Sequence, residues 1–146
     1  MKVSVQREDF DAGMEIRTLS RDPRVGAVAS FVGVVREIAM TLEHYAGMTE
    51  REITKVVEEA SKRWKVMDAT VIHRYGELKP TDQIVLVVVA SAHRGDAFAA
   101  CEFIMDYLKT QAPFWKKEQT PGGERWVDAR ASDDAAAQRW QGHEAT

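Results

Sequence analysis

The stretch Gln83-Ile84-Val85-Leu86-Val87-Val88-Val89-Ala90-Ser91 is a run in which almost every residue is β-branched or Leu. Such a run predicts a central strand covered on both faces, because a strand with one face in water alternates apolar and polar residues. Directly after it, the residues from about Gly95 to Gln111 predict a helix that is apolar on several sides and that Pro113 ends. This strand and this helix form the predicted centre of the fold.

Further elements are predicted on both sides of this centre. Residues 50–64 have apolar side chains at spacings of three and four, and Thr49 with Glu52 makes a capping-box pattern ahead of them, so a helix is expected. The predicted hairpins are Val66–Tyr75 with Gln83–Ser91, Val25–Arg36 with Met40–Tyr45, and Phe114–Gln119 with Glu124–Arg130. The order hairpin, helix, hairpin, helix, hairpin predicts an α+β fold of one domain, residues 1–146, with a largely antiparallel sheet, packed helices and a C-terminal helix and tail over 131–146.

Composition excludes several classes of protein. The 146 residues are 45% hydrophobic, which fits a folded domain, and the longest apolar run is too short to cross a bilayer. The net charge is −3, from 20 basic and 23 acidic residues, which argues against a nucleic-acid binder. One cysteine allows no internal disulfide, and no signal peptide is visible, so a cytoplasmic protein is expected. Residues 109–130 nevertheless hold five basic and three acidic residues, a balance that favours a small anionic ligand.

One candidate site lies where the central strand leads into the helix. The segment Ser91–Asp96 brings His93 and Arg94 to a helix N-terminus, where free backbone N–H groups attract anions. A phosphate or carboxylate site is one interpretation. The alternative is a polar helix start with a solvated arginine.

Two lysines are candidates for proton transfer or nucleophilic attack. Lys109 is in the last turn of the predicted helix, where it could equally satisfy the helix C-terminus and pair with Asp106. Lys116 follows Phe114 and Trp115 on a predicted strand, and alternation points it away from Lys117. Large aromatic neighbours can desolvate a lysine and lower its pKa.

Other reactive residue types have structural interpretations. Cys101 falls on an apolar helix surface and is expected to be a small core residue. His73 shares its strand face with apolar residues, which favours a packed histidine over a functional one. Arg36 and Arg130 each end a predicted strand, where surface ion pairs are common. The four histidines have no ligand-like spacing, and we predict neither a metal nor a bound cofactor.

Strings from about Val25 to Trp140 carry a more specific pattern. They are Thr41–Tyr45, Gly47–Glu50, Val71–Arg74, Gly76–Leu78, Ser91–Arg94, Phe103–Thr110, Ala112–Lys116 and Arg125–Val127. In order and spacing these strings resemble the catalytic (large) subunit of molybdopterin synthase, the MoaE family, over nearly the whole chain.

The resemblance implies a function and a set of partners. It implies a cytoplasmic enzyme of molybdenum cofactor biosynthesis, which converts cyclic pyranopterin monophosphate to molybdopterin by inserting two dithiolene sulfurs. The implied sulfur donor is a small ubiquitin-like subunit with a C-terminal Gly-Gly thiocarboxylate, and the implied assembly is a heterotetramer around a homodimer of large subunits. The implied fold is the α/β hammerhead.

The resemblance also implies roles for six residues. Lys109 and Lys116 match the family's catalytic lysines. The positions associated with the anionic substrate, some of them supplied across the dimer, are Arg36, His93, Arg94 and Arg130. A phosphate and a thiocarboxylate both require cationic neighbours, which agrees with the local basic excess.

The chain departs from the family pattern in two places, and the first of them, a shortened loop, supports an alternative. Only five residues separate Arg36 from Leu42, where a longer loop is usual, and Gln111 replaces a common basic residue. A non-catalytic anion-binding or scaffold subunit with the same fold is therefore the alternative hypothesis. Retention of both Lys109 and Lys116 argues against it.

Overall fold

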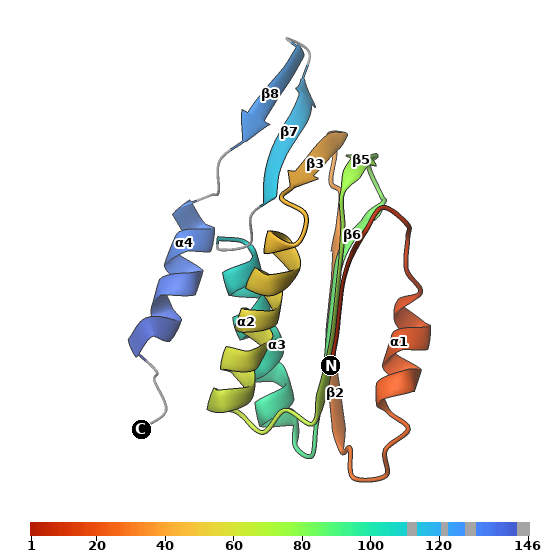
Figure 1. Cartoon of the computed structure of the whole chain (residues 1–146), viewed down its shortest axis with the longest axis vertical. Coiled ribbons are helices and arrows are strands. Elements are labelled where there is room, and N and C mark those ends of the chain that lie inside the picture. Colours follow the sequence, from red (N-terminus) through yellow and green to blue (C-terminus); the bar gives the residue numbers. More distant parts are fainter. Residues whose placement is uncertain (111–113, 121–122, 128–130, 143–146) are drawn as a thin grey trace.

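The computed structural model describes residues 1–110, 114–120, 123–127 and 131–142 (Figure 1). The described chain is a mixed α+β structure, as predicted, and its strands form two four-stranded sheets. In chain order the elements are β1 (Lys2–Gln6), α1 (Ala12–Leu19), β2 (Ala27–Val34), β3 (Met40–His44), α2 (Met48–Arg63), β4 (Asp68–Arg74), β5 (Gly76–Leu78), β6 (Gln83–Ser91), α3 (Arg94–Leu108), β7 (Phe114–Thr120), β8 (Gly123–Val127), α4 (Ala131–Gln138) and the 3-10 helix η1 (Arg139–Gly142).

The predicted central strand lies inside the first sheet. Its strand order is β1-β4-β6-β2, and β6 pairs antiparallel with both β4 and β2. All residues of β6 from Val85 to Ser91 are buried. The predicted hairpin of β4 with β6 is confirmed, although the short β5 lies within its connection.

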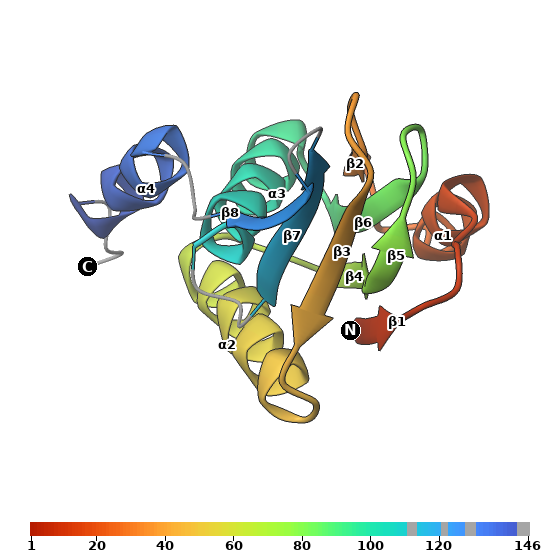
Figure 2. The same cartoon turned by 90° about the horizontal axis from the view of Figure 1, so that it is seen from above.

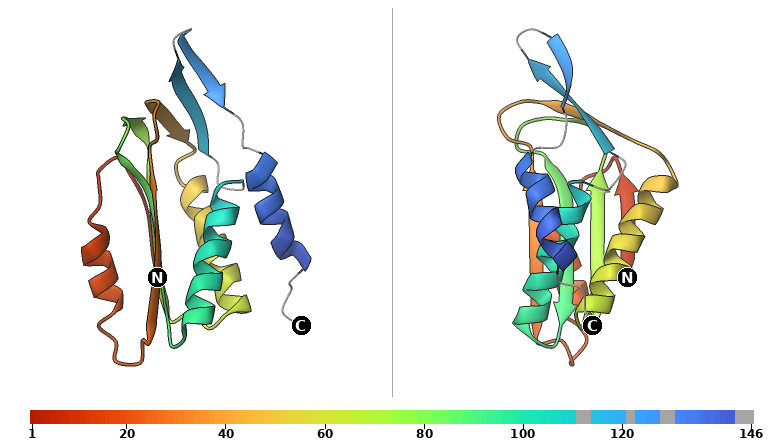
Figure 3. Two further views of the ribbon diagram at one scale, coloured as in Figure 1. Left: turned by 180° about the vertical axis from the view of Figure 1, so that it is seen from behind. Right: turned by 90° about the vertical axis from the view of Figure 1, so that its left-hand side faces the viewer.

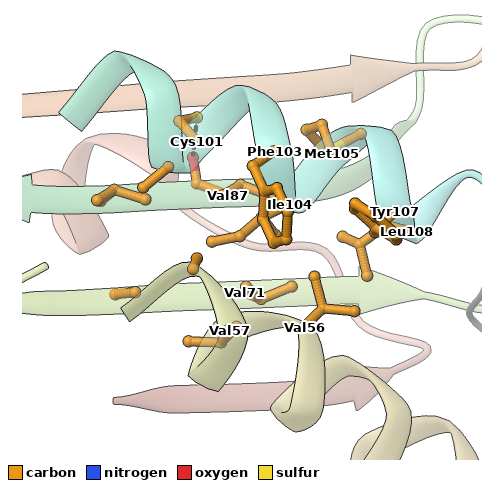
Figure 4. Packing of buried hydrophobic residues seen from close by; sticks show 14 of the residues in the cluster. Val56, Val57, Val71, Val87, Cys101, Phe103, Ile104, Met105, Tyr107 and Leu108 are labelled. Atoms are coloured by element: carbon orange, nitrogen blue, oxygen red, sulfur yellow. Dashed lines mark hydrogen bonds between the residues drawn. The ribbon is translucent and has the colours of Figure 1, made fainter. Parts of the chain in front are cut away.

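The two faces of this sheet are covered by different helices, which is why β6 lacks apolar–polar alternation. Val85, Val87 and Val89 pack with α2 and α3, whereas Leu86 and Val88 pack with α1 on the other face. Figures 1 and 3 show α1 alone on one side of the sheet and α2 with α3 on the other. The close-up in Figure 4 shows residues of α2 and α3 meeting Val71 and Val87.

Cys101 is part of that core, as predicted. Its side chain is buried, and its thiol lies 3.9 Å from the carbonyl oxygen of Val87. Burial, with a smaller contribution from Glu102, raises the pKa of the thiol to about 11, so the unreactive protonated form persists at neutral pH.

The second sheet has the order β5-β3-β7-β8 and lies across one end of the α2–α3 layer (Figure 2). The predicted hairpin of β7 with β8 is confirmed. The predicted pairing of Val25–Arg36 with Met40–Tyr45 is wrong, because β2 joins the first sheet and β3 pairs with β5 and β7. After β2 the chain turns away, since Val35 exchanges backbone hydrogen bonds with the Thr81–Asp82 turn. Met40 and Leu42 are buried instead with Val35 and Leu78 in a separate small core.

Two predictions about the N-terminus of helix α2 need correction. Helix α2 begins at Met48, two residues before the predicted start at residue 50. At its N-terminus the Glu50 carboxylate accepts a hydrogen bond from the Gly47 N–H at 2.7 Å. Thr49 is not the cap, because it is fully buried and donates to the Tyr45 carbonyl instead.

The strand β1 and helix α1 were not predicted; β1 pairs parallel with β4. None of the helices in the described ranges is long and apolar enough to cross a bilayer.

Candidate active site

Lys116 lies on the inner face of the second sheet. Its Cα is paired with Leu42 on β3, and Phe114 is paired with His44, so Lys116 follows the direction of these partly or fully buried side chains. Lys117 is paired with Thr41 and points the opposite way, as alternation predicts. The Lys116 ammonium lies 3.4 Å from the Glu118 carboxylate, and both side chains are mostly covered.

Lys109 caps the C-terminal end of α3. Its backbone N–H donates to Met105, and its side chain is exposed. The pairing with Asp106 that helix spacing suggested is not seen; the Asp106 carboxylate accepts the Trp140 indole N–H at 2.6 Å. Within the described residues the Lys109 ammonium forms no ion pair.

His73 packs against the strand that carries Lys116. Its ring stacks on Phe114, with centroids 3.8 Å apart, and Phe114 is two residues before Lys116 on the same face of β7. Burial lowers the pKa of His73 to about 4, and the charge of Lys109 adds to this effect, so Lys109 lies within electrostatic reach of the ring. Packing makes His73 the buried histidine that the sequence predicts.

A second histidine, His44, completes this group. Its ring lies 4.3 Å from the Tyr75 ring and 6.0 Å from Phe114, and its Nδ1 atom is 3.2 Å from the Thr49 hydroxyl. Sequence reasoning did not select His44, Tyr75 or Glu118. Their common signal is alternation: His44 and Glu118 lie on the strand faces that carry Leu42 and Lys116.

His93 and Arg94 lie at the other end of α3. With Ala92, Gly95 and Gly26 they line an open pocket of about 490 Å³. Gly26 is required there, because a Cβ atom at that position would lie 2.2 Å from the Ala92 carbonyl oxygen. The side chains of His93 and Arg94 are exposed. The pocket combines a guanidinium with the N-terminus of a 15-residue helix, which suits an anion.

The predicted site residues therefore form two groups in one chain. The 15 residues of α3 span about 22 Å, which separates His93 and Arg94 from Lys109. Arg36 lies toward the end of the first sheet that holds His73. Strand β2 ends opposite Gln83, at the start of β6, and His73 is paired with Val85 at the same end of β6. Arg130 lies outside the described residues. No three His, Cys, Asp or Glu side chains in the described ranges converge on a metal position.

Comparison with known proteins decides what this arrangement belongs to. The family described as MoaE protein matches residues 5–111. The molybdopterin synthase catalytic subunit of Ralstonia nicotianae is 60% identical over 94% of this chain and 83% of its own length, and that of Escherichia coli is 53% identical over 95% and 97%. The chain belongs to the MoaE family.

Solved structures agree with the MoaE assignment. The molybdopterin biosynthesis MoaE protein from Burkholderia ambifaria has a TM-score of 0.84 and 57% identity, over 96% of this chain and 98% of that one. A protein–protein complex of subunits 1 and 2 of molybdopterin-converting factor from Helicobacter pylori shares the fold, with a TM-score of 0.73 and 18% identity over 88% and 91% of the two chains. Membership of the MoaE family makes this chain a catalytic subunit of an enzyme, a transferase of molybdenum cofactor biosynthesis.

Proposed function

We propose that this chain converts cyclic pyranopterin monophosphate to molybdopterin, using sulfur from the thiocarboxylated C-terminus of a small ubiquitin-like subunit. The observation that carries the proposal is that Lys116 lies on the same face of β7 as Phe114, whose ring stacks on the buried His73, and that the charge of Lys109 helps to lower the pKa of His73. Two cations beside a buried aromatic group suit a reaction in which a thiocarboxylate sulfur attacks and negative charge develops on oxygen. The cytoplasm is the proposed location.

Lys109 and Lys116 are the proposed catalytic residues. Lys116 is held by Glu118 and by its strand, whereas Lys109 stands at a helix end without an ion pair in the described chain. A fixed ammonium suits stabilisation of the oxyanion, and a free one suits proton transfer or brief acceptance of the acyl group. Glu118 keeps the charge of Lys116 partly compensated until the anionic substrates arrive.

His93 and Arg94 are proposed to bind the substrate phosphate, with Arg36 and Arg130 as further substrate contacts. Because about 22 Å of helix separates His93 and Arg94 from Lys109, we propose that they serve the lysine pair of a second copy. The active assembly is then a homodimer within a heterotetramer, with one small subunit on each large subunit and residues 1–146 acting as one domain.

Exposed apolar side chains support an interface near Arg36. Phe31, Val34 and Ile38, on β2 and just after it, are each more than a third exposed. Sedimentation of the purified chain at micromolar concentration is expected to show a dimer, and addition of the small subunit a larger complex. A monomer that does not associate with the small subunit contradicts the assembly.

A reconstituted assay tests the activity directly. The purified chain, the thiocarboxylated small subunit and cyclic pyranopterin monophosphate are mixed, and dithiolene product is followed by mass spectrometry. Product is expected only with the thiocarboxylate, and a small subunit ending in an ordinary carboxylate is the control. A well-folded chain that binds the small subunit without forming product would favour a scaffold role.

A further inference from the structure

Trp140, in η1, docks the C-terminal end of the described chain on the α2–α3 layer. Its indole N–H donates to the Asp106 carboxylate on α3 at 2.6 Å, and its backbone carbonyl accepts a hydrogen bond from the Arg63 guanidinium at the end of α2 at 2.7 Å. A hydrogen bond to a carboxylate is shorter and stronger than one between neutral groups. We call the bond between Trp140 and Asp106 the clasp.

Aromatic packing supports the clasp. The Trp140 ring meets the Trp64 ring edge-on, with centroids 5.4 Å apart, and the Phe103 ring in the same way at 5.7 Å. Edge-to-face rings at these distances attract one another. The Arg63 guanidinium lies 4.8 Å from the centre of the buried Phe103 ring and is paired with Glu59 at 3.1 Å, so the donor to the Trp140 carbonyl is itself held.

The clasp closes a loop of the chain that contains half of the proposed site residues. Asp106 and Trp140 are 34 positions apart, and Lys109, Lys116 and Arg130 all lie between them in sequence. Helix α4 is in this loop and packs against α3. Figures 1 and 3 show α4 on the outer side of the α2–α3 layer, with the β7–β8 hairpin beyond one end of it.

Strand β8 is the part of this loop for which the clasp matters most. Strand β7 is paired with β3 over five residues, whereas β8, at the edge of the second sheet, is paired with β7 alone. The last residue of β8, Val127, is opposite Lys116. Helix α4 begins four residues later at Ala131, and four residues of chain span at most about 14 Å. Docking of α4 therefore restrains the end of β8 that flanks Lys116.

We propose that Trp140 is a positioning residue for Lys116: through the clasp it keeps α4 on α3, and through α4 it keeps the end of β8 paired beside Lys116. The proposal rests on the proposed function of Lys116. Without the clasp the end of β8 frays, because the end of an edge strand opens at low cost in free energy. Lys116 then loses one of the two strands between which it is held, and with it the fixed geometry that stabilisation of an oxyanion requires.

Matched tryptophan variants separate positioning from packing. Trp140→Phe keeps a ring against Trp64 and Phe103 but removes the indole N–H of the clasp. Trp64→Phe makes the same change in the neighbouring ring and leaves the clasp in place. In the reconstituted assay Trp140→Phe should lose about fivefold in kcat with KM changed less than about twofold, since Lys116 acts on the reacting state. Trp64→Phe should keep its kcat, although both variants lose some stability.

A double variant connects this loss to Lys116. In a Lys116→Ala chain the geometry that the clasp maintains no longer contributes, so adding Trp140→Phe should lower kcat by less than about 1.5-fold. A further loss of about fivefold means that the clasp acts on a group other than Lys116, and it overturns the proposal.

Hydrogen exchange gives a readout that does not depend on activity. Amides of β8 should exchange about tenfold faster in Trp140→Phe than in the natural chain, whereas amides of β6, inside the first sheet, should exchange at the natural rate. A chain that ends at Gln138 lacks the clasp altogether. It should show the same changes in exchange and in kcat, and it replaces Trp140→Phe if that variant does not fold.

The outcomes distinguish this inference from the proposed function. The positioning role requires both the loss of kcat and the faster exchange of β8, and the absence of either overturns it. If Lys116→Ala itself keeps its turnover, the proposed catalytic role of the lysine fails, whatever Trp140 does.

Discussion

The two ends of helix α3 differ in almost every respect. At the C-terminal end, which Lys109 caps, the second sheet carries a group of aromatic and histidine rings, and Lys116 lies on the same strand face as Phe114. At the N-terminal end His93 and Arg94 are exposed around an open pocket that Gly26 makes possible. The helix dipole favours Lys109 at one end and a bound anion at the other. The chain therefore separates the proposed chemistry from the proposed substrate anchoring, which is why we propose that a second copy completes the site.

The largest expected effect is at the lysine end. Lys109→Ala and Lys116→Ala should each reduce turnover by about two orders of magnitude or more, equivalent to at least about 2.7 kcal/mol of transition-state stabilisation. The double variant should lose much less than the product of the two losses, because the lysines act as a unit. Lys117→Ala, on the opposite strand face, is the matched control and should be nearly silent. Equal sensitivity at Lys116 and Lys117 contradicts the assignment.

The next effect concerns stability at the same end. The pKa of His73 is about 4 in the folded chain and 6.5 as its ordinary value, so the unfolded chain binds more protons between these two values. Stability from this group is present above pH 6.5 and falls as the pH drops toward 4. Between pH 7 and pH 5, the free energy of unfolding should fall by about 2 kcal/mol more in the natural chain than in His73→Phe. Parallel denaturant titrations measure the difference; identical slopes contradict the buried neutral state.

A smaller effect is expected at the open end of α3. Arg94→Ala should raise KM about tenfold with less change in kcat, because the contact acts equally on the ground and transition states. The substrate affinity of the natural enzyme should fall as the salt concentration rises, because the contact is between charged groups. An Arg94→Ala enzyme with unchanged substrate affinity contradicts a role of Arg94 in phosphate binding.

Mixed dimers of Arg94→Ala and Lys116→Ala chains sharpen the comparison between the two ends. If the ends of α3 meet across a dimer, one of the two sites in a mixed dimer has both residues intact, and activity at low substrate should recover to about half. If each chain builds its own site, mixing restores nothing.

The smallest effect is expected midway along α3. Cys101→Ala should cost about 1 kcal/mol of unfolding free energy through lost packing, with sulfur transfer intact in the folded protein. Thermal unfolding and the reconstituted assay measure the two quantities. Loss of turnover in a stable variant would mean that the transferred sulfur does not come only from the partner.

Sequence reasoning located the elements whose local signals agree with their tertiary roles. The apolar run of β6 predicted a strand covered on both faces, and the pattern before Pro113 predicted a helix packed on several sides. The core position of Cys101 and the opposite directions of Lys116 and Lys117 followed from periodicity alone. The N-terminal strand β1 carries no comparable signal, because a five-residue edge strand is held mainly by its partner β4.

What the sequence determined by itself was periodicity, charge and family pattern, because these reside in the order of the residues. Only the tertiary structure decided that β3 leaves β2 for a second sheet, since that choice depends on Met40 and Leu42 finding a core with Leu78. It also decided that His73 stacks on Phe114, two residues before Lys116, while Arg94 lies a helix length away from Lys109. These are relations between residues far apart in the chain, and they exist only once packing has brought the segments together.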